Sequence, residues 1–222
     1  MTSDLSRMLN PSSIAVIGGG AWCEQLIKQC KRIGYEGDIW PVHPKKAEVW
    51  GYKAYPTVHD LPSDPDGAFV GVNRYATVDI VRQLSRLGCG GAVCLASGFS
   101  EAASEDEMAG DLQDKLIEAA GDMPFMGPNC YGFINALDGA LLWPDQQGLS
   151  RVESGVAILT QSSNISMNIT MQERALPIAY MVACGNMAQT SQAKIAMAFL
   201  EDPRVTAIGM HIEGFGDLRE WE

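Results

Sequence analysis

The sequence lacks any run of about 18 consecutive apolar residues, which a membrane-spanning helix requires. Its start, MTSDLSRMLNPSSIAVIGGG, has no basic segment followed by an apolar stretch and a cleavage site, so we predict no signal peptide. Basic residues are scarce, with 16 Lys and Arg against 27 Asp and Glu and a net charge of −11. Neither a membrane nor a nucleic acid is therefore expected as a partner. A phosphorylated small molecule is compatible, because backbone N–H groups and one or two lysines suffice to bind it.

Cysteine motifs are also missing, since the chain has no C-x-x-C pair and no histidine at metal-ligand spacing. We therefore predict no disulfide and no metal site. Isolated cysteines in apolar or glycine-rich contexts are typical of reduced thiols, and this predicts a cytoplasmic location. The cysteines are Cys23, Cys30, Cys89, Cys94, Cys130 and Cys184.

What the chain does have is an alternation of short β-rich runs and longer helical periods, which predicts an α/β fold with a parallel sheet. Its 222 residues exceed an average domain of about 150, so we expect one complete domain and a smaller one. In the first domain, the apolar side chains of Leu26, Ile27, Cys30 and Ile33 lie on one face of a predicted helix that ends at Gly34. The predicted strands are 13–17, 38–42, 67–72, 91–96 and 123–126, and helices are predicted after Gly20, over 77–87 and over 105–120.

The passage from residue 127 to residue 148 shows neither period, and we predict a linker there. Strands are then predicted over 155–159, 178–184 and 205–212, with one helix opened by Ser162 and another over 191–200. Three strands are about half of a typical open sheet, so we expect a partial second domain in a piece of a longer protein. The last residues are expected to end a strand and to begin a helix.

Three glycines, Gly18, Gly19 and Gly20, follow the first strand and open a helix, a pattern typical of phosphate binding. Two dinucleotide signals are missing: Cys23 stands at the third glycine of G-x-G-x-x-G, and the second strand ends in V-H-P-K-K without an acidic residue. NAD is therefore disfavoured, whereas a lysine pair suits the extra ribose phosphate of NADP or coenzyme A. The alternative is a plain turn with solvated lysines.

Several motifs then occur in order along the chain. They are IWPVHPK at 39–45, GYKAYPTV at 51–58, GPNCYGFIN at 127–135, QSS at 161–163, GN at 185–186 and EG at 213–214. In these motifs the chain resembles the NDP-forming (ADP-forming) acyl-CoA synthetases, a family that includes the succinyl-CoA synthetase α-subunit. The passages LLWPDQ and PIAYMVACGN look more loosely like a branch of feruloyl-type or other aryl-acid ligases.

The resemblance implies a Rossmann-like CoA-binding domain, with its linker, over 1–145 and a partial flavodoxin-like domain over 146–222. It also implies an acid-thiol ligase that forms acyl-CoA from a carboxylic acid, CoA and a nucleoside triphosphate. In such enzymes Mg-ATP or GTP on an ATP-grasp domain or subunit phosphorylates a histidine, which passes the phosphate to the acid before the CoA thiol displaces it. Neither the acid nor the nucleotide can be specified from the sequence, and self-association stays open.

None of the three histidines matches the family's phosphate carrier, which sits in a small, glycine-bearing loop. His43 lies on the CoA side, His59 lies in a polar passage, and His211 lies within a predicted strand on the same face as Glu213. Glu213 matches the glutamate that orients the carrier imidazole. We therefore expect the carrier histidine to lie beyond this chain and the chain alone to be inactive.

Family positions assign the remaining site residues. Those matched to CoA are Gly18, Gly19, Gly20, Pro44, Lys45, Lys46, Val72, Asn73, Ser97 and Gly98. Those matched to catalysis are Glu213, Asn129, Ser162 and Ser163. The glycine loop is shorter than usual in the family, and Ser163 replaces a glycine that is more common there.

Each catalytic assignment has a structural alternative. The two serines also suit an ordinary helix cap, Asn129 also suits a turn, and Glu213 also suits an exposed strand end. Two other functions compete with the ligase: an NADP-binding oxidoreductase, which leaves the GPNCYGFIN motif without a purpose, and a non-enzymatic CoA-binding regulator, which needs only the first domain.

Overall fold

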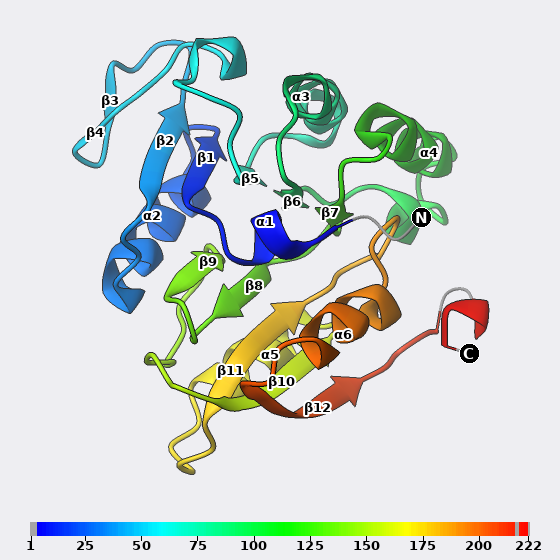
Figure 1. Ribbon diagram of the computed structural model, residues 1–222. Coiled ribbons are helices and arrows are strands. Elements are labelled where there is room, and N and C mark those ends of the chain that lie inside the picture. The colour runs from blue at the N-terminus through cyan, green and yellow to red at the C-terminus, as the bar shows by residue number, and fades with distance from the viewer. Residues whose placement is uncertain (1–3, 216–217, 222) are drawn as a thin grey trace.

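The computed structural model describes residues 4–215 and 218–221 and contains two five-stranded sheets (Figure 1). The first sheet has the order β2-β1-β5-β6-β7, and every neighbouring pair in it is parallel. This confirms the predicted α/β fold with a parallel sheet. The strands are β1 (Ser13–Ile17), β2 (Asp38–Val42), β5 (Gly67–Val70), β6 (Ala92–Cys94) and β7 (Phe125–Met126).

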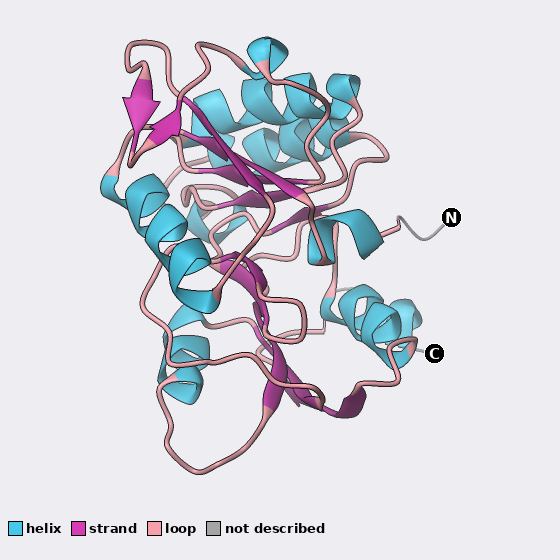
Figure 2. Cartoon of the chain, turned by 60° about the vertical axis from the view of Figure 1, so that its left-hand side comes forward, coloured by secondary structure: helices cyan, strands magenta, loops and turns pink. Residues whose placement is uncertain are grey.

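Helices cover both faces of this sheet, which explains why β1 and β5 are buried along their whole length (Figure 2). On one face lies α2 (Ala21–Ile33), whose buried side chains include Leu26 and Ile27, as the periodicity predicted. On the other face lie α3 (Arg74–Leu87) and α4 (Met108–Ala120). The helix α3 begins three residues earlier than predicted, because Asn73 caps it.

The predicted linker is wrong in part, because two strands form within it. They are β8 (Gly132–Asn135) and β9 (Ala140–Leu142), which pair as an antiparallel hairpin. Both strands are completely buried, so neither shows the alternation of apolar and polar residues that marks a half-exposed strand. The sequence therefore gave no periodic signal for them.

The hairpin also corrects the expectation of a three-stranded half sheet. The second sheet has the order β12-β10-β11-β8-β9, in which β12, β10 and β11 are parallel, β8 is antiparallel to β11, and β9 is antiparallel to β8. Its remaining strands are β10 (Gly155–Thr160), β11 (Ile178–Ala183) and β12 (Val205–His211), and its helices are α5 (Ser163–Thr170) and α6 (Gln192–Leu200). By strand pairing, residues 132–142 thus belong with the second sheet.

One hydrophobic core connects the two sheets. Side chains of α2 and of β1 pack in the same buried cluster as Phe133 and Leu141 of the hairpin and Met181 of β11. The α2 face of the first sheet is therefore covered by a helix and by the edge of the second sheet together. The two sheets therefore share buried side chains and pack directly on each other.

The remaining elements are short. They are α1 (Ser6–Leu9), the β3 (Glu48–Val49) and β4 (Tyr52–Lys53) ribbon, and 3-10 helices at Val58–Asp60, Ser100–Ala102 and Leu218–Trp221. Within the described residues no helix has the length and apolar character needed to cross a bilayer. The same residues contain no group of three or more His, Cys, Asp or Glu placed to hold a metal ion.

Candidate functional site

The glycine turn after β1 has a backbone that other residues would disrupt. Gly18 has φ +128°, and a Cβ on it would stand 2.6 Å from the carbonyl oxygen of Gly71. Gly20 caps α2 without any side-chain hydrogen bond, and no atom lies within 4 Å of where its Cβ would be. The N–H of Cys23 donates to the carbonyl oxygen of Gly20 at 3.1 Å, and no side chain caps the N–H groups of Ala21 and Trp22, which could therefore bind an anion.

His43 links this turn to the lysine pair after β2. Its Nδ1 accepts the backbone N–H groups of Lys45 (3.1 Å) and Lys46 (3.0 Å), and its ring occupies the space that a Cβ on Gly19 would need. The Nζ of Lys46 also lies 3.9 Å from a carboxylate oxygen of Glu24 in the first turn of α2. The sequence placed His43 on the CoA side but missed this ordering role, although the V-H-P-K-K turn is visible in it.

The C-terminal ends of the parallel strands β5 and β6 lie next to each other. Asn73 uses its side chain to accept N–H groups at the start of α3, and Val72 packs on the core, so each has a structural role in addition to the predicted one. Arg74 ties the two strand ends together, because its Nη1 donates to the carbonyl oxygen of Gly98 at 2.7 Å. Ser97 is exposed beside it.

Glu101 connects this edge to the second sheet. Its carboxylate accepts the backbone N–H groups of Gly98 (2.6 Å) and Phe99 (3.2 Å), and it also accepts a hydrogen bond from the side-chain amide of Asn186. The partners Glu101 and Asn186 are 85 residues apart. No local sequence pattern announces such a contact, and sequence reasoning missed it.

Asn129 lies where the two sheets meet. Its backbone is left-handed (φ +57°), a conformation that asparagine tolerates better than most residues, and its side chain is exposed. A Cβ on Gly185, which follows β11, would stand 2.6 Å from the carbonyl oxygen of Asn129. The N–H of Asn186 donates to the Pro128 carbonyl oxygen at 3.0 Å. The loop after β7 and the loop after β11 are therefore held together by a hydrogen bond and by close backbone packing.

At the second helix start, after β10, the side chain of Ser162 caps one backbone N–H group. The Oγ of Ser162 accepts the N–H of Ile165 at 3.3 Å, which is an N-cap, and Ser163 begins α5. The N–H of Ser162 donates to Oγ1 of Thr160 at 3.1 Å. Both serines therefore lie just after the C-terminal end of β10, and β10 is the strand that pairs with β11.

Glu213 lies just beyond the end of β12, beside the same strand end. His211 Nδ1 stands 3.3 Å from Thr160 Oγ1 and 3.9 Å from a carboxylate oxygen of Glu213. The side-chain amide of Gln161 donates to the carbonyl oxygen of Gly214 at 2.6 Å and accepts its N–H at 3.1 Å. The structure thus brings Ser162, Ser163 and Glu213 together at neighbouring strand ends. His59 lies in the 3-10 helix Val58–Asp60 of the first region.

The cysteine in the GPNCYG motif has an unreactive thiol. Cys130 is completely buried, and this burial raises the pKa of its thiol to about 12. A thiol that stays protonated at neutral pH is a poor nucleophile. Cys130 is therefore not a candidate nucleophile of this loop.

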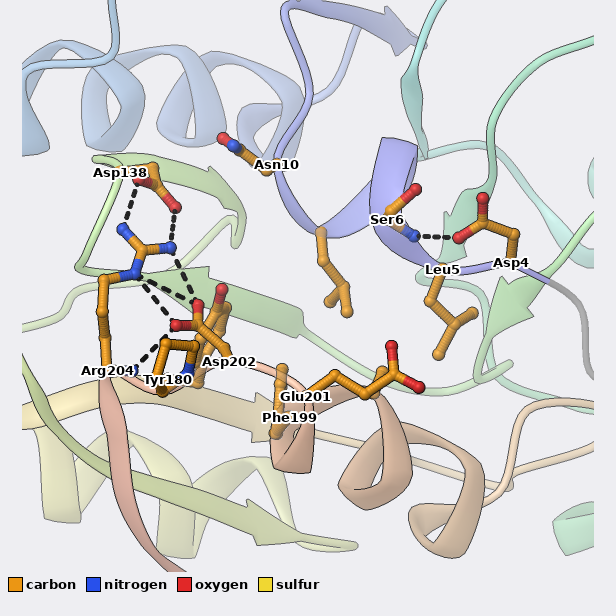
Figure 3. Close-up of a pocket in the computed structure, with 13 residues that line it drawn as sticks. Asp4, Leu5, Ser6, Asn10, Asp138, Tyr180, Phe199, Glu201, Asp202 and Arg204 are labelled. Atoms are coloured by element: carbon orange, nitrogen blue, oxygen red, sulfur yellow. Dashed lines mark hydrogen bonds and ion pairs between the residues drawn. The ribbon is translucent and has the colours of Figure 1, made fainter.

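A hollow of about 430 Å³ lies elsewhere, between α1 and the turn after α6 (Figure 3). None of the predicted site residues lines it. Arg204 crosses one side and donates to both Asp138 (2.8 Å) and Asp202 (2.8 Å). These hydrogen bonds lower the pKa of both carboxyl groups. The hollow is thus bordered by an ion-pair cluster that joins β12 to the hairpin.

Comparison with known protein families assigns both parts of the chain. Residues 12–136 match the CoA binding domain family, and residues 153–221 match the succinyl-CoA ligase like flavodoxin domain. The first match alone covers more than half of the chain. The two matched ranges follow the order that the sequence motifs predicted.

Individual relatives agree with this assignment. Trans-feruloyl-CoA synthase FCS1 from an unknown prokaryotic organism is 32% identical over 94% of this chain and 31% of its own length. The ADP-forming acetate-CoA ligase of Methanocaldococcus jannaschii is 28% identical over 97% of this chain and 30% of its own length. The chain thus spans about a third of these relatives.

A solved structure shows the same architecture. The dinucleotide forming acetyl-coenzyme A synthetase 1 of Ca. Korarchaeum cryptofilum superimposes with a TM-score of 0.87 at 26% identity. The superposition covers 98% of this chain and 48% of that protein. The chain therefore belongs to the CoA binding domain family and joins that domain to a succinyl-CoA ligase like flavodoxin domain, which confirms the predicted kinship with the ADP-forming acyl-CoA synthetases.

Proposed function

We propose that this chain is the CoA-binding, α-subunit-like part of an NDP-forming acyl-CoA ligase. The observation that carries the proposal is the meeting of two strand-end sites. The open start of α2 lies at the end of β1, and the start of α5 lies at the end of β10. The Asn129 loop, joined to Gly185, stands at the contact between the two sheets. Ligands of open α/β sheets bind at such strand ends.

The first region supplies the proposed CoA site. The backbone of Gly18, Gly19 and Gly20 would hold the pyrophosphate, and Lys45 or Lys46 would attract the ribose phosphate. The open helix start and the His43-ordered lysine turn fit these groups. Strand ends at Val72 and Asn73, and at Ser97 and Gly98, would line the adenine and pantetheine path. When bound, CoA supplies the thiol that accepts the acyl group.

The second region supplies the proposed phosphoryl site. The start of α5, at Ser162 and Ser163, offers N–H groups and a partial positive charge to a phosphoryl group. Asn129, exposed at the contact between the sheets, would hold the acyl phosphate. Glu213 is half-exposed beside this helix start and would accept a hydrogen bond from a carrier imidazole, which fixes the tautomer of that imidazole.

None of the three histidines in this chain is proposed as the phosphate carrier. A carrier must move between a nucleotide and the acid, which needs a mobile loop. His211 is instead held in β12, where it pairs in register with Thr160 of β10. The carrier histidine and the ATP-grasp domain or subunit that uses Mg-ATP or GTP are proposed as separate parts of the complete enzyme.

Phosphate labelling tests this division of roles. The chain is incubated with γ-labelled ATP or GTP, Mg²⁺ and an ATP-grasp partner, and acid-labile label is measured; a parallel incubation with added CoA and acetate is assayed for acyl-CoA. We expect no label on this chain and no acyl-CoA. Label on His211, or acyl-CoA formed by the chain and that partner alone, would show that the active site is misplaced.

A matched pair of variants in the complete enzyme tests Glu213. Glu213→Gln removes the charge that orients the imidazole and should lower the rate of histidine phosphorylation at least tenfold, about 1.4 kcal/mol, with CoA affinity nearly unchanged. Glu220→Gln changes a carboxylate on the 3-10 helix Leu218–Trp221 and should leave the rate within about twofold. Equal rates for wild type and Glu213→Gln would remove Glu213 from the proposed site.

The proposed partners are a small carboxylic acid, CoA and the ATP-grasp component. We also propose a cytoplasmic location, because all six cysteines are free and buried, as in proteins of a reducing compartment. The known relatives include ligases named for ferulate, acetate and 4-hydroxybutyrate, so their names alone leave the acid open.

A further inference from the structure

The backbone of His43 is anchored where the glycine turn, residues 18–20, meets the end of β2. The N–H of Gly18 donates to the carbonyl oxygen of Val42 at 3.2 Å, and the N–H of His43 donates to the carbonyl oxygen of Tyr55 at 2.9 Å. Pro44 follows His43, and a residue before proline favours an extended backbone. His43 therefore continues the line of β2 directly beside the glycine turn.

The hydrogen bonds of the His43 imidazole define which nitrogen carries the proton. Nδ1 accepts the N–H groups of Lys45 and Lys46, so it presents a lone pair to both. A neutral imidazole whose Nδ1 accepts carries its proton on Nε2. The ring is therefore a hydrogen-bond donor through Nε2.

The Nε2 side of the ring lies against Gly19. A Cβ built on Gly19 would stand 2.4 Å from Nε2 and 2.5 Å from Cδ2, which is closer than any side chain tolerates. Gly19 does not have a positive φ, unlike Gly18. Glycine at position 19 is therefore explained by the space that the His43 ring takes, and the ring is part of the wall of the glycine turn.

The Nε2–H group is available to a ligand. Within residues 4–215 and 218–221, the imidazole makes its hydrogen bonds through Nδ1. His43 is partly exposed, and its Nε2 is not among the buried polar atoms of those residues that lack a partner, so solvent reaches it. The uncapped N–H groups of Ala21 and Trp22 follow Gly19 by two and three positions. An anion at the start of α2 therefore has a side-chain donor beside it.

We propose that the Nε2–H group of His43 donates a hydrogen bond to the pyrophosphate of CoA. This inference rests on the proposed CoA site and adds a direct ligand contact to the ordering of the lysine turn by Nδ1. A hydrogen bond to an ionised phosphate oxygen is stronger than one between neutral groups. The two ring nitrogens thus have separate tasks, one toward the protein and one toward the ligand.

The extra ribose phosphate of CoA is the other anion that could accept this hydrogen bond. Nδ1 faces the backbone of Lys45 and Lys46, whereas Nε2 faces Gly19. The ribose phosphate is proposed to lie at the lysines and the pyrophosphate at the glycine turn. Nε2 is therefore assigned to the pyrophosphate.

Urea denaturation tests the position of the ring without any ligand. Gly19→Ala puts a Cβ against the ring, but in a His43→Ala background that space is empty. We expect Gly19→Ala to lower the urea midpoint of the wild type more than that of His43→Ala, because residues in contact have non-additive effects. Equal shifts in the two backgrounds would show that the ring does not lie against Gly19.

Calorimetry with CoA and with 3′-dephospho-CoA, which keeps the pyrophosphate and lacks the ribose phosphate, tests the contact itself. His43→Asn keeps an oxygen that can accept the lysine N–H groups but ends short of Nε2. We expect it to weaken both ligands by the same factor, about tenfold. The double variant Lys45→Met/Lys46→Met should weaken CoA only. His59→Asn, which changes an exposed imidazole in the 3-10 helix Val58–Asp60, is the control and should leave both affinities unchanged.

The possible results separate this inference from the proposed function. If the wild type binds both ligands and His43→Asn binds them equally well, this inference alone fails. If His43→Asn weakens CoA and leaves 3′-dephospho-CoA unaffected, the hydrogen bond belongs to the ribose phosphate, and the assignment to the pyrophosphate is overturned. If the folded wild type binds neither ligand, the proposed CoA site fails together with this inference.

Discussion

The helices that follow a central strand of each sheet have different N-terminal caps. After β1, Gly20 leaves the start of α2 without a side-chain cap, whereas after β10 the hydroxyl of Ser162 caps α5. An uncapped start leaves N–H groups that water or an anion can satisfy, whereas the Ser162 cap satisfies one N–H group of α5 within the protein. This difference fits the proposed roles, in which the first helix start binds a phosphate of CoA and the second binds a phosphoryl group only transiently.

The outer strands of the two regions also differ. The edge strand β2 of the first sheet is buried from Ile39 to Val42, but β12 in the second sheet has no buried residue. The edge strand of the first sheet is thus covered by other residues of the chain. The second region presents Glu213 and the start of α5 on a face that is open to other parts of an enzyme.

The largest effect is expected from a change in the uncapped start. Gly19→Asp puts a carboxylate in the proposed phosphate loop and a Cβ where the His43 ring lies, so CoA affinity should fall by well over tenfold, about 1.4 kcal/mol or more. Gly20→Ala is the control, because no atom lies within 4 Å of its Cβ position and its φ is −84°. Calorimetry measures both, and equal affinity in the two variants would mean that the phosphate binds elsewhere.

A smaller effect is expected at the capped start. Ser162→Ala removes the acceptor for the Ile165 N–H and should lower the free energy of unfolding by about 1 kcal/mol, as loss of an N-cap does elsewhere. Urea denaturation gives this value, with Asn164→Ala, an exposed position in the same turn, as the control. A stability loss below a few tenths of a kcal/mol would show that α5 does not depend on its cap.

The smallest effect concerns the ion pairs of the two regions. Because hydrogen bonds from Arg204 lower the folded pKa of Asp138 and Asp202, their stabilisation is complete above the unfolded pKa of about 4 and disappears as the pH falls through the lowered folded values. Arg204→Met should therefore cost about 0.5 kcal/mol near pH 6, since the cluster is partly exposed, and less near pH 3. Arg82→Met, which breaks an exposed pair with Asp79, should cost less at both pH values. Urea titrations that show the same loss for both variants, at both pH values, would contradict this difference.

The sequence predicted those elements whose signal is local. The strand over 13–17, the helix after Gly20 and the cap at Ser162 all follow from neighbouring residues, and all three are observed. The β8 and β9 hairpin was missed because complete burial removes the alternation that identifies a strand. Its place in the second sheet depends on pairing with β11, which comes later in the chain.

The same limit applies to the candidate site. The glycine turn and the residues around Asn129 could be named from motifs, whereas the contact of Glu101 with Asn186 joins residues 85 positions apart. His43 was visible in the sequence, but its role depends on the approach of its ring to Gly19. Contacts between strand ends arise from the packing of the two sheets, and residue spacing does not encode them.

The most direct test of the central claim is a calorimetric titration of the unaltered, folded chain with CoA and, separately, with NADPH. Both ligands carry an adenine, a pyrophosphate and an extra ribose phosphate. The comparison therefore isolates the contribution of the pantetheine of CoA against that of the nicotinamide riboside of NADPH. We expect saturable binding of CoA and much weaker binding of NADPH. Clear binding of NADPH with no detectable binding of CoA would contradict it.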